Sequence, residues 1–183
     1  MVFSVFEKEK HVNAMERQLL DYMVELSKHN LTGDQRDIMA TLMNTINDVE
    51  RIGDHSDNIA ELALVNIESR AKFSEDARAE LTSMFDTVHD AYKMALLTYK
   101  TTDTEIGMTV FEKEKIINKM EKTLRNNHIV RLNEGACLTQ TGIIFLDTIS
   151  NLERIGDHST NIAESIIEVV NKKRVVTEIL EDN

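Results

Sequence analysis

A fifteen-residue phrase that occurs twice is the feature that most constrains how this chain folds. The letters DVERIGDHSDNIAEL at 48–62 return as NLERIGDHSTNIAES at 151–165, with eleven of the fifteen positions identical. A second pair of matching segments precedes it in the same order, VFEKEKHVNAMERQL at 5–19 and VFEKEKIINKMEKTL at 110–124. A unit of one element followed by another therefore occurs twice, and both copies must present the same side chains.

The elements of this unit are expected to be helices. Apolar residues recur at three- and four-residue steps, the chain has no proline, and no segment alternates as a strand does. Starts are marked by capping patterns at Thr32 with Gln35, at Ser74, and at Thr102 with Glu105. The expected helices cover about 5–29, 33–70, 74–101, 103–131 and 134–170, followed by a charged tail at 173–183. The clearest apolar stripe lies in the third helix: Ala77, Leu81, Met84, Val88, Ala91 and Ala95.

Short connections between these helices predict an all-α bundle of long antiparallel helices, forming one domain over residues 1–183. Repeat 1 would span about 3–71 and repeat 2 about 74–172. The helix at 74–101 has no counterpart ahead of repeat 1, so we expect that five helices are present and the first helix of the first repeat is missing. The alternative is that five helices are the complete design. A missing helix would leave an apolar groove along residues 5–71, open to a homodimer partner, the tail or a neighbour.

Composition narrows the class of partner. The formal net charge of −11 argues against nucleic acid, which needs a basic face, and against direct binding to anionic lipid, while it suits cations. Cys137 is the only cysteine, so the chain forms no intrachain disulfide and a reducing compartment is expected. No apolar run approaches the roughly 20 residues of a membrane span, and no signal peptide is visible.

The duplicated phrase carries a stripe of oxygen donors. On a helix, residues at i, i+4, i+7, i+8 and i+11 lie along one face, and the preceding helix of each unit aligns three more donors. In the first copy these residues are Glu50, Asp54, Asp57, Asn58 and Glu61, with Glu9, Asn13 and Glu16 on the preceding helix. In the second copy they are Glu153, Asp157, Thr160, Asn161 and Glu164, with Glu114, Asn118 and Glu121.

Something must offset the repulsion between Glu50 and Asp54, which stand four residues apart. One hypothesis is a ladder of salt bridges from Lys8 and Lys10 on the preceding helix. The other is a bound divalent or trivalent metal, because all-oxygen donor sets suit Mg, Ca, Mn or Fe. Most acidic stripes are solvated faces, but the duplication of this one favours metal.

Two further residue types recur inside the phrase. A mid-helix glycine costs about 1 kcal/mol relative to alanine, so Gly53 and Gly156 indicate close approach by a neighbouring helix. His55 and His158 turn about 100° from the adjacent aspartates, which favours a packing or supporting role over direct ligation.

With Glu-Arg-Ile-Gly-Asp-His-x-x-Asn-Ile-Ala present twice, the chain resembles the PhoU family over residues 3–172. The resemblance implies two three-helix repeats, a cytoplasmic role in regulating phosphate uptake and signalling, and multinuclear metal clusters on Glu/Asp-x-x-x-Asp motifs. Those motifs match Glu50 with Asp54 and Glu153 with Asp157, whereas the paired motifs on the preceding helices end in asparagine, with one fewer charge per site. The implied metal ligands are Glu9, Asn13, Glu50, Asp54, Asp57, Glu114, Asn118, Glu153 and Asp157. The implied metal is Fe, Mn, Zn or Mg.

Because a leading helix is absent, the arrangement is most similar to the PhoU-like C-terminal domain of sodium-dependent phosphate cotransporter family proteins. This implies a non-enzymatic, metal-binding regulatory domain on the cytosolic side, whose partner is the membrane transporter segment of the same longer protein. The alternatives are a metal-free helical interaction module or a stand-alone PhoU-like regulator of phosphate signalling. An all-α metal-dependent hydrolase is less favoured, because the chain lacks the Glu-x-x-His and paired Glu-x-x-Glu and Glu-x-x-Asp motifs of such enzymes.

Overall fold

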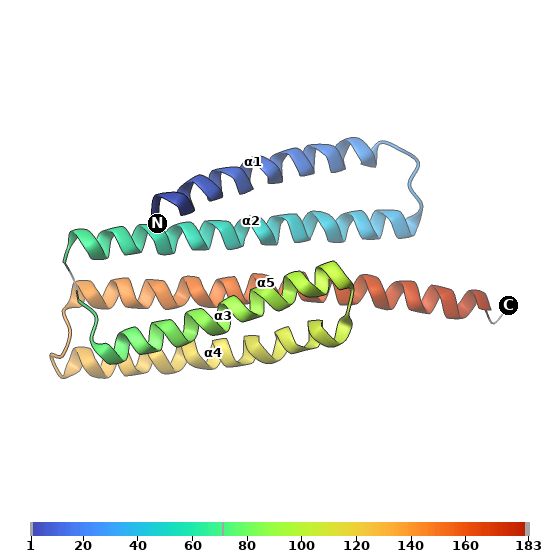
Figure 1. Ribbon diagram of the computed structural model, residues 1–183. Helices are drawn as coiled ribbons and strands as arrows, with labels where there is room; N and C mark the ends of the chain where they lie inside the picture. The colour runs from blue at the N-terminus through green and yellow to red at the C-terminus, as the bar shows by residue number, and fades with distance from the viewer. Residues whose placement is uncertain (1, 71, 182–183) are drawn as a thin grey trace.

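The computed structural model describes residues 2–70 and 72–181, and within them it contains helices and no strand. The helices are α1 (Val2–Ser27), α2 (Gly33–Glu68), α3 (Glu75–Thr101), α4 (Thr104–Asn133) and α5 (Thr139–Glu181), arranged as long antiparallel rods (Figure 1). The predicted all-α class is confirmed. In the described part of the chain, no helix is long and apolar enough to cross a membrane.

Two of the predicted capping signals form as expected. The Thr32 hydroxyl accepts from the backbone N–H of Gln35, and the Gln35 side chain accepts from the backbone N–H of Thr32, which completes a capping box at the start of α2. The Ser74 hydroxyl accepts from the backbone N–H of Ala77 and opens α3. Each of these bonds satisfies a donor that the first helical turn leaves unpaired.

The third capping prediction was wrong by one residue. Thr102 does not cap α4; it takes the left-handed conformation, with φ 57°, and closes α3. Asp103 is the N-cap of α4, and its carboxylate accepts from the backbone N–H groups of Glu105 and Ile106. A carboxylate at this place also interacts favourably with the helix dipole, an advantage that a threonine hydroxyl lacks.

The last helix also differs from the prediction at both ends. It begins at Thr139 rather than near residue 134, because Gly135 has φ +67° and turns the chain out of the helical conformation. It continues past residue 170 to Glu181, so most of the predicted tail is helical in its backbone.

The helices form one complete three-helix unit and one helix pair. α2 and α5 lie side by side at the centre; α3 and α4 pack on α5 and on each other, and α1 packs on α2 alone (Figure 1). The fully buried side chains concentrate where α3, α4 and α5 meet, and they include Met84, Ile117 and Phe145. The predicted stripe of α3 lies in this core, whereas α1 contains no buried residue.

The duplicated glycines meet different neighbours. A Cβ built on Gly156 would lie 3.0 Å from Ile117 Cδ1 and 3.3 Å from Ile117 Cγ2, and Ile117 is fully buried. A Cβ on Gly53 would lie 3.5 Å from Val12 Cγ1, an ordinary van der Waals contact. The predicted close approach therefore exists between α4 and α5, while α1 and α2 leave room for a methyl group.

This difference gives a matched pair of variants. Gly53→Ala should keep or raise stability, by up to about 1 kcal/mol from helix propensity. Gly156→Ala gains the same propensity but must displace the packed Ile117, so it should be the less stable of the two by roughly 1 kcal/mol or more. Urea denaturation of both variants measures the difference, and equal midpoints would contradict it.

Candidate functional site

The carboxylate stripe of the first repeat lies along the seam between α1 and α2. The pKa of Glu50 is raised, first by burial and then by the negative charges of Asp54, Glu16 and Glu9. Four carboxylates from two helices therefore act on one another at this seam. The predicted ligand Asp57 is not among the charges that raise the pKa of Glu50. Its Oδ1 atom is buried and has no hydrogen-bond partner among the described residues.

The second repeat builds the same cluster between α4 and α5. Burial raises the pKa of Glu153 most, and the charges of Asp157, Glu121 and Glu114 add to it. The pKa of Asp157 is raised by burial and by the charge of Glu114. The duplicated sequence therefore places two carboxylates from each of two helices together in both repeats.

One asparagine in each cluster leaves an oxygen unpaired. Asn13 donates its amide to Glu9, and Asn118 donates to Glu114 Oε1 at 2.5 Å. In both residues the Oδ1 atom is buried and has no hydrogen-bond donor. A buried acceptor without a donor is unfavourable, and a cation would satisfy both it and the surrounding carboxylates.

The lysine ladder of the first hypothesis does not form among the described residues. Lys10 pairs with Glu7 of its own helix at 3.0 Å, and neither Lys8 nor Lys10 makes a salt bridge to α2 among the described residues. Arg51 lies beside the stripe, with Nε 3.8 Å from Glu50 Oε2. The first cluster keeps a large excess of negative charge.

The second cluster is better compensated. Arg125 pairs with Glu121 and also donates to the Ser150 hydroxyl at 3.1 Å. The position equivalent to Arg125 in the first repeat is Leu20, which carries no charge. The two clusters therefore differ in net charge by this one arginine.

The donor set fits a hard cation in chemistry but is not assembled around one point. Among the described side chains, those of residues 2–70 and 72–172, no three His, Cys, Asp or Glu groups are placed to share a metal ion. Glu9 and Glu114 each accept a hydrogen bond from the asparagine four residues later. Carboxylate and amide oxygens are otherwise the ligands that Mg²⁺, Mn²⁺ and Fe ions take.

Glu16 and Glu121 belong to the clusters although the predicted ligand set left them out. They lie seven residues, or two helical turns, after Glu9 and Glu114 on the same face. The seven-residue spacing in the sequence therefore indicates both residues. The Glu/Asp-x-x-x-Asp motifs do not include them, because those motifs end four residues after their first carboxylate.

The histidines of the phrase join the two repeats rather than the clusters. The His55 ring donates from Nδ1 to Asn151 Oδ1 at 2.9 Å, and the His158 ring donates from Nδ1 to Asp48 Oδ1 at 2.8 Å. The two rings stack with centroids 5.6 Å apart. Asp48 and Asn151 occupy equivalent positions of the repeat, so the contact is reciprocal. The predicted packing role of these histidines is confirmed.

Two asparagines of the phrase complete this contact. Asn58 donates to Asn151 Oδ1 at 3.2 Å, and Asn161 donates to Asp48 Oδ1 at 3.0 Å. Burial lowers the pKa of His55, whose acceptor is an amide rather than a carboxylate. Both asparagines belong to the predicted oxygen stripe, but in the structure they hold α2 against α5.

Comparison with known proteins identifies the family of this chain. The family model for the PhoU domain matches residues 1–63 and 81–166. The chain belongs to the PhoU family. It is 27% identical over 172 residues to PhoU homolog 1 of Thermotoga maritima, a phosphate-specific transport system accessory protein, covering 93% of this chain and 73% of that protein. It is 25% identical to the Pseudomonas aeruginosa homolog of the same name, covering 91% and 68%.

Solved PhoU structures share the fold. PhoU from Pseudomonas aeruginosa superposes with a TM-score of 0.86 at 23% identity, covering 93% of this chain and 81% of that one. The phosphate transport system regulatory protein PhoU from Streptococcus pneumoniae gives 0.80 at 20% identity, covering 92% and 78%. These PhoU relatives are named as accessory and regulatory proteins, which agrees with the predicted absence of enzymatic activity.

The contact between the PhoU repeats can be tested at Asp48. Asp48→Ala leaves the His158 ring and the Asn161 amide without their acceptor, so unfolding free energy should fall by about 1–3 kcal/mol. Asp37→Ala is a matched control, because Asp37 pairs only with the exposed Lys172 at 3.5 Å and should lose less than about 1 kcal/mol. Similar losses in urea denaturation would contradict the role of Asp48.

The raised pKa values predict how stability without metal depends on pH. Glu50 and Glu153 bind protons more tightly in the folded chain than in the unfolded one, where their pKa is near 4.5. Their ionisation therefore does not change the free energy of unfolding below that pH. It lowers the free energy of unfolding as the pH rises from there through the pKa of the folded state. In EDTA, the double variant Glu50→Gln, Glu153→Gln should melt a few degrees above the parent at neutral pH and together with it near pH 4.5.

The control for this comparison is Glu7→Gln, an exposed carboxylate of α1 outside the cluster. Its melting curve should follow the parent at both pH values. A double variant that melts below the parent at neutral pH would show that the clustered charges stabilise the metal-free fold.

Proposed function

We propose that this chain is a PhoU-type accessory regulator of phosphate transport, and that its two carboxylate clusters bind metal ions. The observation that carries the metal proposal is the pair of equivalent seams, each with four mutually acting carboxylates and one buried, unpaired asparagine oxygen. Membership of the PhoU family and the names of the relatives carry the proposal of phosphate regulation.

The comparisons support a separate regulator more than a cotransporter module. The relatives are named as accessory and regulatory proteins of phosphate transport systems, and none of them is named as a domain of a sodium-dependent cotransporter. We therefore infer that the partner is a phosphate transport system in the membrane that is a separate polypeptide. A single cysteine and an acidic surface suit a cytoplasmic location.

The metal would occupy the two seams unequally. Glu121 is already paired with Arg125, whereas Glu16 has Leu20 in the corresponding place. The seam between α1 and α2 therefore gains more from an added cation than the seam between α4 and α5. In both seams, the carboxylates of Glu50 or Glu153 and of the aspartate four residues later would supply oxygen ligands, together with the unpaired asparagine oxygen.

A metal-free interaction module remains the second candidate, because one observation favours it. The histidines and asparagines of the phrase form hydrogen bonds between α2 and α5. These contacts explain why that part of the phrase occurs twice, without any ligand. Under this alternative the clustered carboxylates form a recognition surface for a basic partner.

Elemental analysis of the tag-free chain, purified without chelator, separates the two candidates. We expect bound metal in the parent and its loss in the double variant Asp54→Ala, Asp157→Ala, with an Asp37→Ala control that retains it. Metal should also raise the melting temperature of the parent and leave that of the double variant unchanged. If the parent stays metal-free after incubation with Fe, Mn, Zn and Mg, the metal proposal is wrong.

Regulation of phosphate transport needs a cellular test. Removing the gene from its host should change phosphate uptake, and the parent chain should restore it. If uptake is unaffected by the removal, the phosphate proposal is wrong whatever the metal content shows. Restoration by the double variant would separate regulation from metal binding.

A further inference from the structure

The two carboxylate clusters differ in the cations that each repeat supplies for itself. Arg51 and Arg154 occupy equivalent positions, and the positive charge of each opposes the rise in the pKa of the glutamate before it. These two arginines therefore do not distinguish the seams. Among the basic side chains that bind a cluster carboxylate, Arg125 of α4 has no counterpart, because the equivalent residue of α1 is Leu20.

Arg125 joins the two helices of the second seam. Its guanidinium donates to Glu121 of its own helix, with Nε 2.7 Å from Oε1, and to the Ser150 hydroxyl of α5, with Nη2 3.1 Å from Oγ. The Glu121 side chain is only 16% exposed, so water screens this pair less than it screens an ion pair on an open surface. Ser150 lies about one helical turn before Glu153, which places the guanidinium at the edge of the cluster.

The first seam has no such link. Among the described residues, the side-chain hydrogen bonds of α1 stay within α1, and none of them reaches α2. Glu16 is the counterpart of Glu121, and in the described part of the chain it makes no salt bridge. Its charge therefore remains free to raise the pKa of Glu50.

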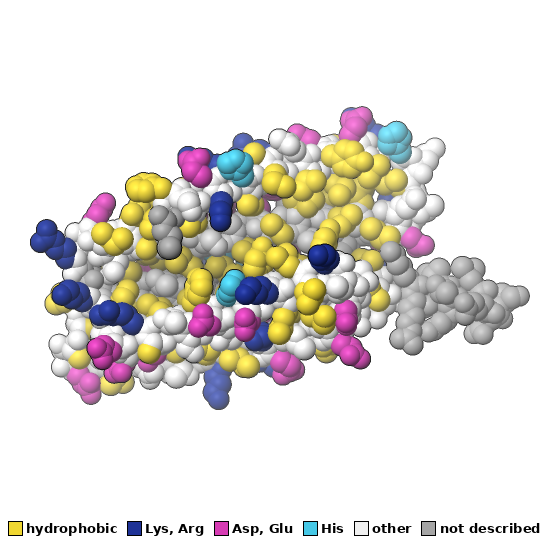
Figure 2. Space-filling model, in the orientation of Figure 1, with side chains coloured by type: hydrophobic (Ala, Val, Ile, Leu, Met, Phe, Trp, Pro, Cys, Tyr) yellow, Lys and Arg dark blue, Asp and Glu magenta, His cyan; other side chains and the backbone are white. Residues whose placement is uncertain are grey.

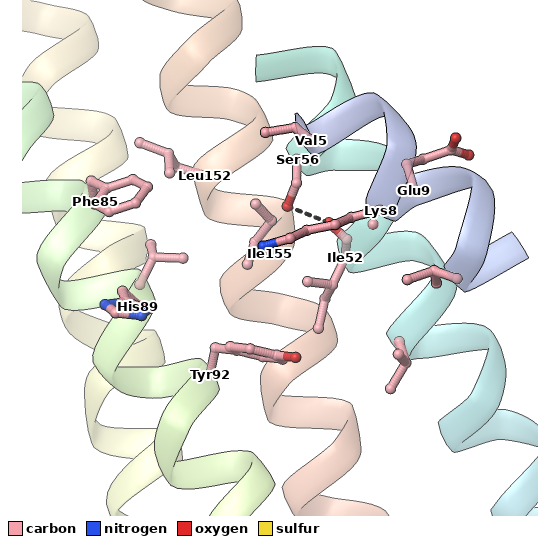
Figure 3. A pocket seen from close by; sticks show the side chains of 14 residues that line it. Val5, Lys8, Glu9, Ile52, Ser56, Phe85, His89, Tyr92, Leu152 and Ile155 are labelled. Carbon is pink, nitrogen blue, oxygen red and sulfur yellow. Dashed lines mark hydrogen bonds between the residues drawn. The ribbon is translucent and has the colours of Figure 1, made fainter. Parts of the chain in front are cut away.

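Lys8 of α1 does not supply the missing cation. It lines an apolar cleft of about 430 Å³, with Ile52 and Ile155 among the other lining residues, and it makes no salt bridge among the described residues. Figure 2 shows apolar side chains along this hollow, and Figure 3 shows Lys8 extending into it toward Ile155, with Glu9 pointing the other way. The cleft corresponds to the apolar groove expected along residues 5–71.

We propose that Arg125 is an internal cation that competes with metal at the seam between α4 and α5, an inference that rests on the proposed metal binding. A metal ion that binds Glu121 must displace the guanidinium, and it then lies near a positive charge that the first seam lacks. The seam between α1 and α2 offers four carboxylates without this competitor. Tight metal binding is therefore confined to the first seam, where the metal links two helices as Arg125 links them in the second.

This difference makes α1 the helix whose attachment responds to metal. α1 packs on α2 alone and has no buried residue, and the carboxylates across its seam repel one another. α4 packs on both α3 and α5, and Arg125 already joins it to α5. Removing metal should therefore loosen α1 and leave α4 in place.

Two reciprocal variants test the inference by calorimetric titration with Mn²⁺. Arg125→Leu gives the second seam the residue of the first, and it should tighten binding there by on the order of tenfold, because one nearby positive charge is removed. Leu20→Arg should weaken binding at the first seam by a similar factor, since the new guanidinium can pair with Glu16 four residues earlier. Asp54→Ala and Asp157→Ala assign each binding step to its seam.

Matched controls separate the contact from the charge and from the loss of a side chain. Lys119→Leu removes the same charge from an exposed site of α4, and Leu20→Gln replaces the leucine without adding a charge. Both controls should bind Mn²⁺ as the parent does. Hydrogen exchange gives a local readout, in which Mn²⁺ should slow exchange in α1 of the parent much more than in α4. In Arg125→Leu, Mn²⁺ should slow exchange in α4 as well.

The outcomes distinguish this inference from the proposal on which it rests. Equal affinities at the two seams of the parent would overturn the inference and leave the metal sites standing. The same holds if Arg125→Leu and Lys119→Leu change the weaker binding step alike, because the effect would then be one of net charge. If neither the parent nor any variant binds Mn²⁺, the metal proposal and this inference are both wrong.

Discussion

The packing of α2 against α5 determines where everything else in this molecule lies. The two helices carry the two copies of the duplicated phrase, and they meet through His55 with Asn151 and His158 with Asp48. Because each contact uses a donor from one copy and an acceptor from the other, the two helices are fixed in one register. The remaining helices attach to the outer sides of this pair.

Each copy of the phrase makes two kinds of contact, because the helix that carries it packs against two other helices. One side of α2 and α5 carries the histidines and asparagines that join the repeats, and another carries the carboxylates that face α1 and α4. Packing alone explains the first set. It does not explain why half-buried carboxylates stand together twice and raise the pKa of Glu50 and of Glu153, since such an arrangement weakens the metal-free fold. A cation at each seam would account for this second set.

Local signals in the sequence predicted most of the fold. Helix periodicity and the caps at Thr32 and Ser74 gave the class and several boundaries, because these depend on residues within one or two turns. The start of α5 was missed because the conformation of Gly135 is set by its loop. The acceptor of His55 lies 96 residues away, and no periodicity indicates such a partner. For the site, the carboxylates were predicted, but how their side chains turn depends on packing between helices.

The unequal burial of the two repeats has a consequence for α1. This helix touches only α2, has no buried residue, and carries Glu9 and Glu16 of the first cluster on the seam that holds it. A cation at this seam would relieve the repulsion between the carboxylates of the two helices and so hold α1 against α2. In the second repeat, α3 packs on α4 and Arg125 pairs with Glu121, so α4 depends less on a cation.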